Sequence, residues 1–230
     1  MIACSVCGHQ NDDLAVLCAS CHSYVQSKVD NLDLFKTMWQ LIEMPSVAFR
    51  KIVMSSHKNY VLLLSSLLGI SIAFGAIWLK KLGSRFGDLF SVVGSGTITG
   101  IPLGIFFVAL LGIMLVILIK LLNGKARFKN AFAVVAYSGV PIILSLVFVL
   151  PLEIAIFGVD FFGNNPPPMV LNPQVYVALL AFDILAILWA WFLLYSGIRV
   201  LSGFPKGKSL LSTLVISFVP GILSFGFKLL

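Results

Sequence analysis

Five long apolar segments follow residue 60, and they constrain the fold more than any other feature of the chain. A helix needs about 20 apolar residues to cross the hydrocarbon core of a bilayer. Strands are excluded because the segments are too long and do not alternate. The sequence therefore predicts an all-α membrane protein whose domain 59–230 holds five transmembrane helices, over residues 61–79, 101–119, 131–158, 175–195 and 209–227.

Composition supports the same fold class. Only 11% of the residues are charged and the mean hydropathy is +1.03, whereas a soluble domain carries about 25% charged residues. The net charge of +7 comes from basic residues that flank the apolar segments. Because these residues do not form one stripe, the sequence argues against nucleic-acid binding.

The basic residues also predict an orientation. With the N-terminus inside, the cytoplasmic connections hold twelve Lys and Arg residues and the outer connections hold four. Cytoplasmic loops of membrane proteins carry such an excess. We therefore expect a multi-pass protein of the cell (inner) membrane, with a cytoplasmic N-terminus and an extracytoplasmic C-terminus.

A small head, residues 1–26, precedes the apolar region and holds two Cys-x2-Cys pairs. Each pair can present two thiolates to one ion, and four thiolates suit a structural Zn²⁺ ion. A head of this size cannot build a core of its own, so the metal would supply the folding free energy. Gly8 follows the first pair, where a positive φ is useful. The predicted zinc ligands are Cys4, Cys7, Cys18 and Cys21.

A pair of disulfides is the alternative for these cysteines. It would require an oxidising compartment, whereas the charge distribution places the head in the cytoplasm. Four thiolates leave no open position on a metal, so a structural zinc is favoured over a catalytic one. His9 and His22 are interpreted as exposed neighbours of a complete four-cysteine site.

Residues 27–58 are predicted to form two amphipathic juxtamembrane helices. Asp30 is expected to cap the first helix, with Asp33 in its first turn, and Pro45 to end it and begin the second. Two interpretations stay open for both helices. They lie at the membrane surface, with Trp39 at headgroup level, or they pack against the cytoplasmic face of the bundle.

Asp183 lies near the middle of the fourth predicted span. Burying a carboxylate there is costly, which makes Asp183 a candidate functional residue that could carry a proton or bind a cation. The favoured interpretation is an interhelical hydrogen bond to a hydroxyl, such as that of Tyr137 or Ser138. Glu153, near the outer end of the third span, is expected at the interface.

Glycines and prolines recur within the predicted spans. Gly96, Gly100 and Gly104 recur at four-residue spacing, which predicts close packing of helices. Proline is common in membrane helices and predicts kinks here. The prolines concerned are Pro141 and Pro151, which interrupt the third segment, and Pro220 in the fifth.

Several stretches resemble known families. The pattern CSVCGHQNDDLAVLCASC resembles the zinc-ribbon heads of many prokaryotic proteins, with His22 where such heads often carry glycine. Three further stretches resemble the Yip membrane proteins: EMPSVAFRKI at 43–52, NGKARFKNAFAVVAYSGVP at 123–141 and GIRVLSGFPKGKSL at 197–210. The Yip resemblance covers about residues 43–228, and the zinc head points to a prokaryotic branch.

The resemblance implies an integral membrane helical bundle with five spans. Eukaryotic Yip proteins interact with Rab-type GTPases and act in vesicle transport. Their Asp-Leu-Tyr-Gly-Pro element is missing from this sequence, so GTPase binding is not carried over.

No enzyme motif is present in the sequence. The leading hypothesis is a non-enzymatic membrane scaffold or accessory subunit. Its zinc head would be a cytoplasmic docking surface, and its spans would contact lipid, another membrane protein or complex, or a second copy. The alternatives are a small transporter or channel that uses Asp183, and a membrane-shaping or trafficking factor that acts through residues 30–57.

Overall fold

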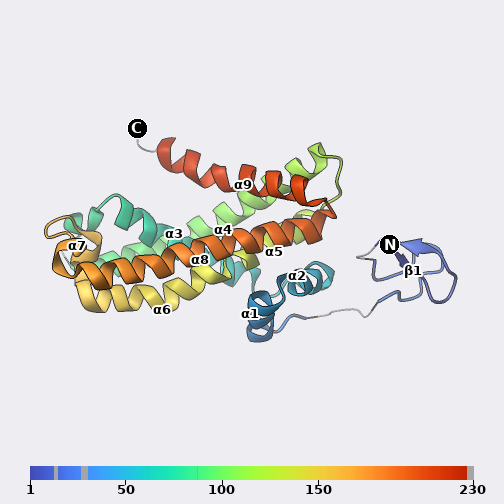
Figure 1. Ribbon diagram of the computed structural model, residues 1–230, viewed down its shortest axis with the longest axis horizontal. Coiled ribbons are helices and arrows are strands. Elements are labelled where there is room, and N and C mark those ends of the chain that lie inside the picture. The colour runs from blue at the N-terminus through green and yellow to red at the C-terminus, as the bar shows by residue number, and fades with distance from the viewer. Residues whose placement is uncertain (13–14, 27–30, 87, 227–230) are drawn as a thin grey trace.

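The computed structural model describes residues 1–12, 15–26, 31–86 and 88–226. A bundle of long helices forms most of this part of the chain, and the N-terminal head projects from one end of the bundle (Figure 1). The helices are α1 (Leu34–Glu43), α2 (Pro45–Met54), α3 (Val61–Leu79), α4 (Leu89–Leu121), α5 (Phe128–Ser138), α6 (Val140–Phe157), α7 (Pro168–Leu171), α8 (Pro173–Ser202) and α9 (Lys206–Gly226). Short 3₁₀ helices, η1 (Leu82–Arg85) and η2 (Gly158–Phe162), and strands β1 (Ile2–Ala3) and β2 (Gln10–Asn11) complete it.

Four helical segments of the described chain are long and apolar enough to cross a membrane, so the predicted all-α membrane fold is confirmed. They are Val61–Leu79, Leu89–Leu121, Phe128–Phe162 and Pro173–Ser202. The predicted fifth span, 209–227, falls in α9. Residue 227 and the side chains of 219–226 lie outside the described part of the chain. The fifth crossing therefore stays a prediction.

The long helices run back and forth along one axis (Figure 1). The turns after α4 and α8 lie at the end that carries α1, α2 and the head, and η1 and α7 lie at the opposite end. The first end thus gathers the three basic connections on which the predicted orientation rests.

The second span begins earlier than predicted, at Leu89 rather than at residue 101. The Asp88 carboxylate caps α4 by accepting a hydrogen bond from the Ser91 N–H. Hydroxyl groups in the added turns form hydrogen bonds within the helix. The Thr99 hydroxyl, for example, donates to the Ser95 carbonyl at 2.6 Å. Hydropathy alone could not locate this start.

The third span is broken where the sequence predicted a kink. α5 ends at Ser138 and α6 begins at Val140, which places Pro141 in the first turn of α6, where its missing N–H costs nothing. α6 then continues through Pro151 without a break. Pro220 lies among the residues of α9 whose side chains are not described.

The juxtamembrane helices pack one face on the bundle. Asp33, rather than Asp30, is the cap of α1, because its carboxylate accepts from the Lys36 N–H at 2.8 Å; Asp30 lies outside the described residues. Pro45 begins α2 as predicted. Phe49 and Ile52 of α2 are fully buried in the core that α3, α4, α5 and α8 share.

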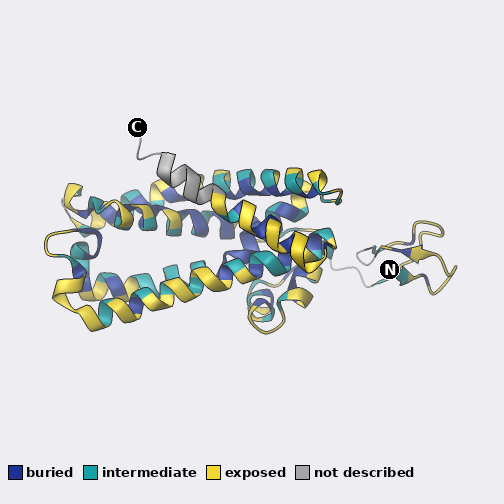
Figure 2. Cartoon of the chain, turned by 45° about the horizontal axis from the view of Figure 1, so that its top comes forward, coloured by how far each residue is buried: buried dark blue, intermediate teal, exposed yellow. Residues whose placement is uncertain are grey.

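Buried side chains line the inner faces of the helices, whereas the outer faces are largely exposed (Figure 2). A second, aromatic-rich cluster closes the far end of the bundle, where Phe74 of α3 meets Phe162 of η2 with ring centroids 5.8 Å apart. The exposed outer positions carry large apolar residues such as Phe106, Phe148 and Phe182. Such a surface is stable in lipid but not in water.

Candidate metal centre and intramembrane polar contacts

Two short hairpins build the head. β1 pairs antiparallel with β2 and encloses the turn that holds Cys4 and Cys7. An isolated bridge between Leu17 and Tyr24 encloses the turn that holds Cys18 and Cys21. Each Cys-x2-Cys pair therefore lies at the tip of a hairpin, where both side chains can point to one side.

The two turns repeat the same backbone hydrogen bonds. In the first, the Cys4 N–H donates to His9 at 2.9 Å and the Gly8 N–H donates back to Cys4 at 2.9 Å. In the second, Cys18 donates to Ser23 at 2.8 Å and His22 donates to Cys18 at 3.1 Å. Gly8 and His22 are thus equivalent positions. Both have positive φ, +71° and +56°, in the region where glycine is the least strained residue.

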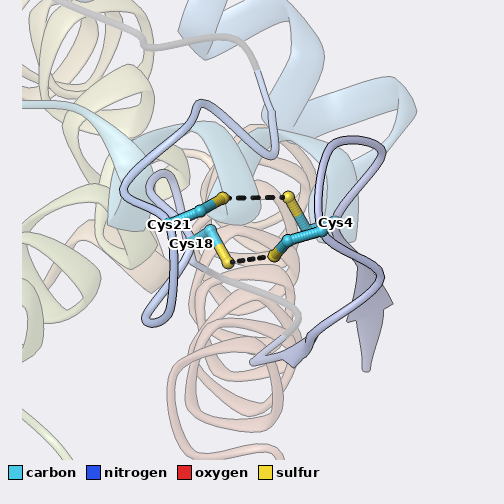
Figure 3. Close-up of side chains that lie close together, drawn as sticks. Cys4, Cys18 and Cys21 are labelled. Carbon is cyan, nitrogen blue, oxygen red and sulfur yellow. Dashed lines mark hydrogen bonds between the residues drawn. The ribbon is translucent and has the colours of Figure 1, made fainter.

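The hairpins bring the four thiol groups together. The Sγ atoms of Cys4 and Cys21 are 3.6 Å apart, and those of Cys7 and Cys18 are 3.5 Å apart (Figure 3). All four sulfurs lie within 4.8 Å of one another. The cluster is therefore a possible metal site, in which each turn contributes two ligands.

The donor set fits a tetrahedral thiolate site. Four sulfurs at about 2.3 Å from one Zn²⁺ ion lie about 3.8 Å from each other, close to the separations found here. A disulfide would bring two sulfurs to about 2.05 Å, and all four cysteines are free thiols. Cys4, Cys18 and Asn11 are the buried residues of the described part of the head, so protein packing alone gives it almost no core.

Polar groups around the cluster stabilise thiolates. The Ser23 hydroxyl lies 3.1 Å from the sulfur of Cys4 and 2.9 Å from that of Cys21. The Asn11 side-chain amide donates to the Cys18 sulfur at 3.5 Å and to the His9 carbonyl at 2.8 Å, which ties the two turns together. Such groups hold the ligands in position and tune a metal site.

The thiol pKa values shift in opposite directions. The hydrogen bond from Ser23 lowers the pKa of Cys4 to about 6, and the Cys21 backbone N–H lowers the pKa of Cys18. The His9 backbone N–H lowers the pKa of Cys7, but its sulfur neighbours and burial outweigh this effect and raise the pKa to about 12. The raised pKa keeps the proton on the Cys7 sulfur, and a bound cation would displace it.

The two equivalent turn positions should respond differently to substitution, because Gly8 is already glycine and His22 is not. Gly8→Ala forces an L side chain into the left-handed region and should weaken the metal-bound head by about 1 kcal/mol. His22→Gly relieves the same strain, so metal affinity should rise by a few fold or stay unchanged. Competition with a chromogenic chelator measures both affinities. Equal losses in both variants would refute the equivalence of the two turns.

Within the membrane bundle, Asp183 of α8 accepts a hydrogen bond from the Ser145 hydroxyl of α6. Its partner is therefore a hydroxyl on another helix, but not that of Tyr137 or Ser138. Tyr137 is fully buried and donates to the Asn59 carbonyl at 2.8 Å, which joins α5 to the turn before α3. Ser138 donates to the Val135 carbonyl within its own helix.

Glu153 of α6 is buried rather than exposed at the interface, with 3% of its surface accessible. Its carboxyl group lies beside that of Asp183 and interacts with it. Two carboxyl groups and a hydroxyl thus meet between α6 and α8. Sequence reasoning missed both Ser145 and the proximity of Glu153, because the relative register of two helices decides these contacts.

Glycines permit the closest helix contact, between α3 and α4. A Cβ atom on Gly104 would lie 2.1 Å from the Ser65 carbonyl oxygen, and one on Gly69 would lie 2.1 Å from the Gly100 carbonyl oxygen. Gly96 faces the ring of Phe74, 3.0 Å from its hypothetical Cβ. The backbones of the two helices therefore touch at Gly69, Gly100 and Gly104. The sequence pattern did not include Gly69, which lies on the opposing helix.

Comparison with known proteins identifies the membrane domain. Residues 39–227 match the sequence model of a family described as Yip1 domain. The match extends from within α1 past the end of α9, so the cysteine head lies outside it. No curated protein and no solved structure matches the chain.

Proposed function

The chain belongs to the Yip1 domain family, and from this premise we propose that it is a non-enzymatic membrane scaffold, an accessory subunit of a membrane complex, whose zinc-bound head is its docking module. Family membership and four apolar helices support a membrane-embedded role. The observation that carries the docking role is the four-sulfur cluster in a head that projects from the bundle (Figure 1). A metal held by four thiolates has no open position for a substrate, so its role is to stabilise the folded surface of the head rather than to catalyse a reaction.

Exposed apolar side chains give the head a surface suited to a protein partner. Val6 lies between the first two cysteines, and Leu17 and Tyr24 flank the other two. All three side chains are exposed. Tyrosine is enriched among the residues that anchor protein interfaces, and the exposed Val6 and Leu17 add apolar area near it. We expect the partner to be another membrane protein or a complex of such proteins.

The proposed location is the cell (inner) membrane of a prokaryote, with the head in the cytoplasm and the C-terminus outside. The excess of Lys and Arg at the end of the bundle next to the head supports this orientation. A reducing cytoplasm would also keep the four cysteines available for zinc.

Affinity purification from native membranes in mild detergent tests the docking role. Wild-type protein should bring down a partner in stoichiometric amount, and Val6→Ser with Tyr24→Ser should lose it while zinc content and membrane insertion stay unchanged. Because zinc content and membrane insertion report on the fold, loss of the partner alone from this double variant would be an effect of the altered surface. Recovery of the protein alone, or of the same partner with the altered head, would contradict the proposal.

A second candidate function, a small transporter or channel, is favoured by one observation. Glu153 and Asp183 meet beside Ser145 between two transmembrane helices, and carboxyl groups in such positions often move ions. We propose instead that Asp183 links α6 to α8, because transport sites usually gather more polar groups than these.

The Asp183→Asn variant separates the two functions. An asparagine keeps an oxygen that can accept from Ser145, so a structural link predicts a change in unfolding free energy of less than about 1 kcal/mol. Reconstituted vesicles should show no pH-driven ion flux with either protein. Flux in the wild type that Asp183→Asn abolishes would establish the transporter and overturn the structural role.

A further inference from the structure

The apolar face of α1 is wider than its contact with the bundle. Leu41 is fully buried, and Leu34 and Met38 pack against the main core. Next to this covered strip runs a second strip, Phe35, Trp39 and Ile42, spaced at i, i+4 and i+7. These side chains are 81%, 62% and 43% exposed. Within the described part of the chain, only half of the apolar face of α1 is therefore covered.

The position of α1 places the open strip beside the bundle. The Asn59 side-chain amide donates to the Asn31 side chain at 3.3 Å, which ties the residues before α1 to the residues before α3. Leu62 and Leu63, in the first turn of α3, already carry exposed apolar side chains. Figure 1 shows α1 at the side of the bundle, not beyond its end. α1 thus lies at the level where the chain enters the apolar layer.

The charges around α1 match an anionic surface. Residues 31–60 carry four basic and two acidic side chains. Lys36 is exposed and follows Phe35 directly, and Lys51 donates to the neutral Gln40 side chain at 3.0 Å. The nearby connections 122–127 and 203–208 add basic residues and no acidic ones. Anionic headgroups attract such groups.

We propose that the open strip of α1, formed by Phe35, Trp39 and Ile42, inserts into the headgroup region of an anionic bilayer, and that Lys36 and Lys51 contact the lipid phosphates. Both interpretations of the juxtamembrane segment then hold for α1. One half of its apolar face packs against the bundle, and the other half binds lipid. Lipid is favoured over a second protein as the occupant, because α1 lies beside the start of the first span, where Leu62 and Leu63 are exposed, and because the basic residues nearby suit anionic headgroups.

Fluorescence quenching by brominated lipid tests this insertion in the full-length protein. A variant with Trp78→Phe, Trp189→Phe and Trp191→Phe leaves Trp39 as its one tryptophan. In nanodiscs, bromine near the headgroup end of the acyl chains should quench Trp39 more than bromine at the chain terminus, because interfacial helices insert about 5–10 Å. Acrylamide in the water phase should quench it weakly. If the triple variant fails to fold, the difference between wild type and Trp39→Phe supplies the same signal.

Trp189 is the matched control. It is exposed near the middle of α8, so a variant that keeps Trp189 alone should be quenched most by bromine at the chain terminus. Quenching of Trp39 by acrylamide but not by lipid would overturn the proposal, and so would protection from both, which indicates a protein partner or a second copy. Anionic lipid should increase the shallow quenching, and Lys36→Gln with Lys51→Gln should remove that increase. Equal quenching in anionic and zwitterionic lipid would overturn the role of the two lysines.

Discussion

Cys18→Ser is expected to remove the metal ion and the fold of the head while leaving the membrane bundle intact. The Cys18 sulfur is buried and faces that of Cys7 at 3.5 Å. Metal binding by small thiolate modules supplies about 10–16 kcal/mol, nearly all of their folding free energy. Mutating groups behind the ligands already costs about 10–100-fold in metal affinity, so losing a ligand should cost more than about 100-fold.

Elemental analysis and hydrogen exchange of the full-length protein measure the two parts of this prediction. Cys18→Ser should retain less metal after dialysis, and its head amides should exchange freely while those of α3 and α4 stay protected. Ser5→Ala, an exposed position in the first turn, is the control and should change neither. Ser23→Ala should be intermediate, because its hydroxyl contacts two sulfurs without being a ligand. A fully protected head in metal-free Cys18→Ser would contradict the account.

Gly104→Ala is expected to destabilise the membrane bundle by about 1–3 kcal/mol, although alanine is the better helix former. The added methyl group would meet the Ser65 carbonyl oxygen at 2.1 Å and the Gly69 Cα at 2.5 Å. Backbone atoms cannot rotate away as a side chain can, so α3 and α4 must separate. The loss follows from the lost packing between two membrane helices.

Gly94→Ala on the same helix is the matched control, because a Cβ there would have no neighbour within 4 Å. It should leave the unfolding free energy unchanged or raise it by up to about 1 kcal/mol. Reversible unfolding in mixed micelles compares the two variants directly. If both substitutions gave the same stability, the close contact of α3 and α4 would be wrong.

The sequence predicted features that depend on local pattern. Apolar length located the spans, and the Cys-x2-Cys spacing located four sulfurs that do lie together. His22, where the sequence comparison expected glycine, has a φ of +56°, which lies in the region that favours glycine. These signals need no knowledge of how distant segments pack.

Contacts between segments could not be predicted in the same way. The sequence contains several hydroxyl groups that could reach Asp183. The relative rotation of α6 and α8 decides that the Ser145 hydroxyl is the one that bonds to it. Gly100 and Gly104 formed a visible pattern, but their contact with Gly69 depends on where α3 crosses α4. The start of α4 at Leu89 was not predicted, because the first turns of this helix contain small polar residues. Their hydroxyl groups form hydrogen bonds within the helix, which hydropathy does not register.

Thiol labelling with a membrane-impermeant maleimide tests the central claim, a metal-bound head on the cytoplasmic side of a membrane bundle. The four cysteines of the head are the full set in this chain, so the wild-type protein needs no substitution. We expect no labelling in intact cells, little labelling after permeabilisation, and reaction of all four thiols once a chelator is added. Labelling in intact cells would place the head outside, and full labelling of permeabilised cells without a chelator would show that no metal protects the cysteines.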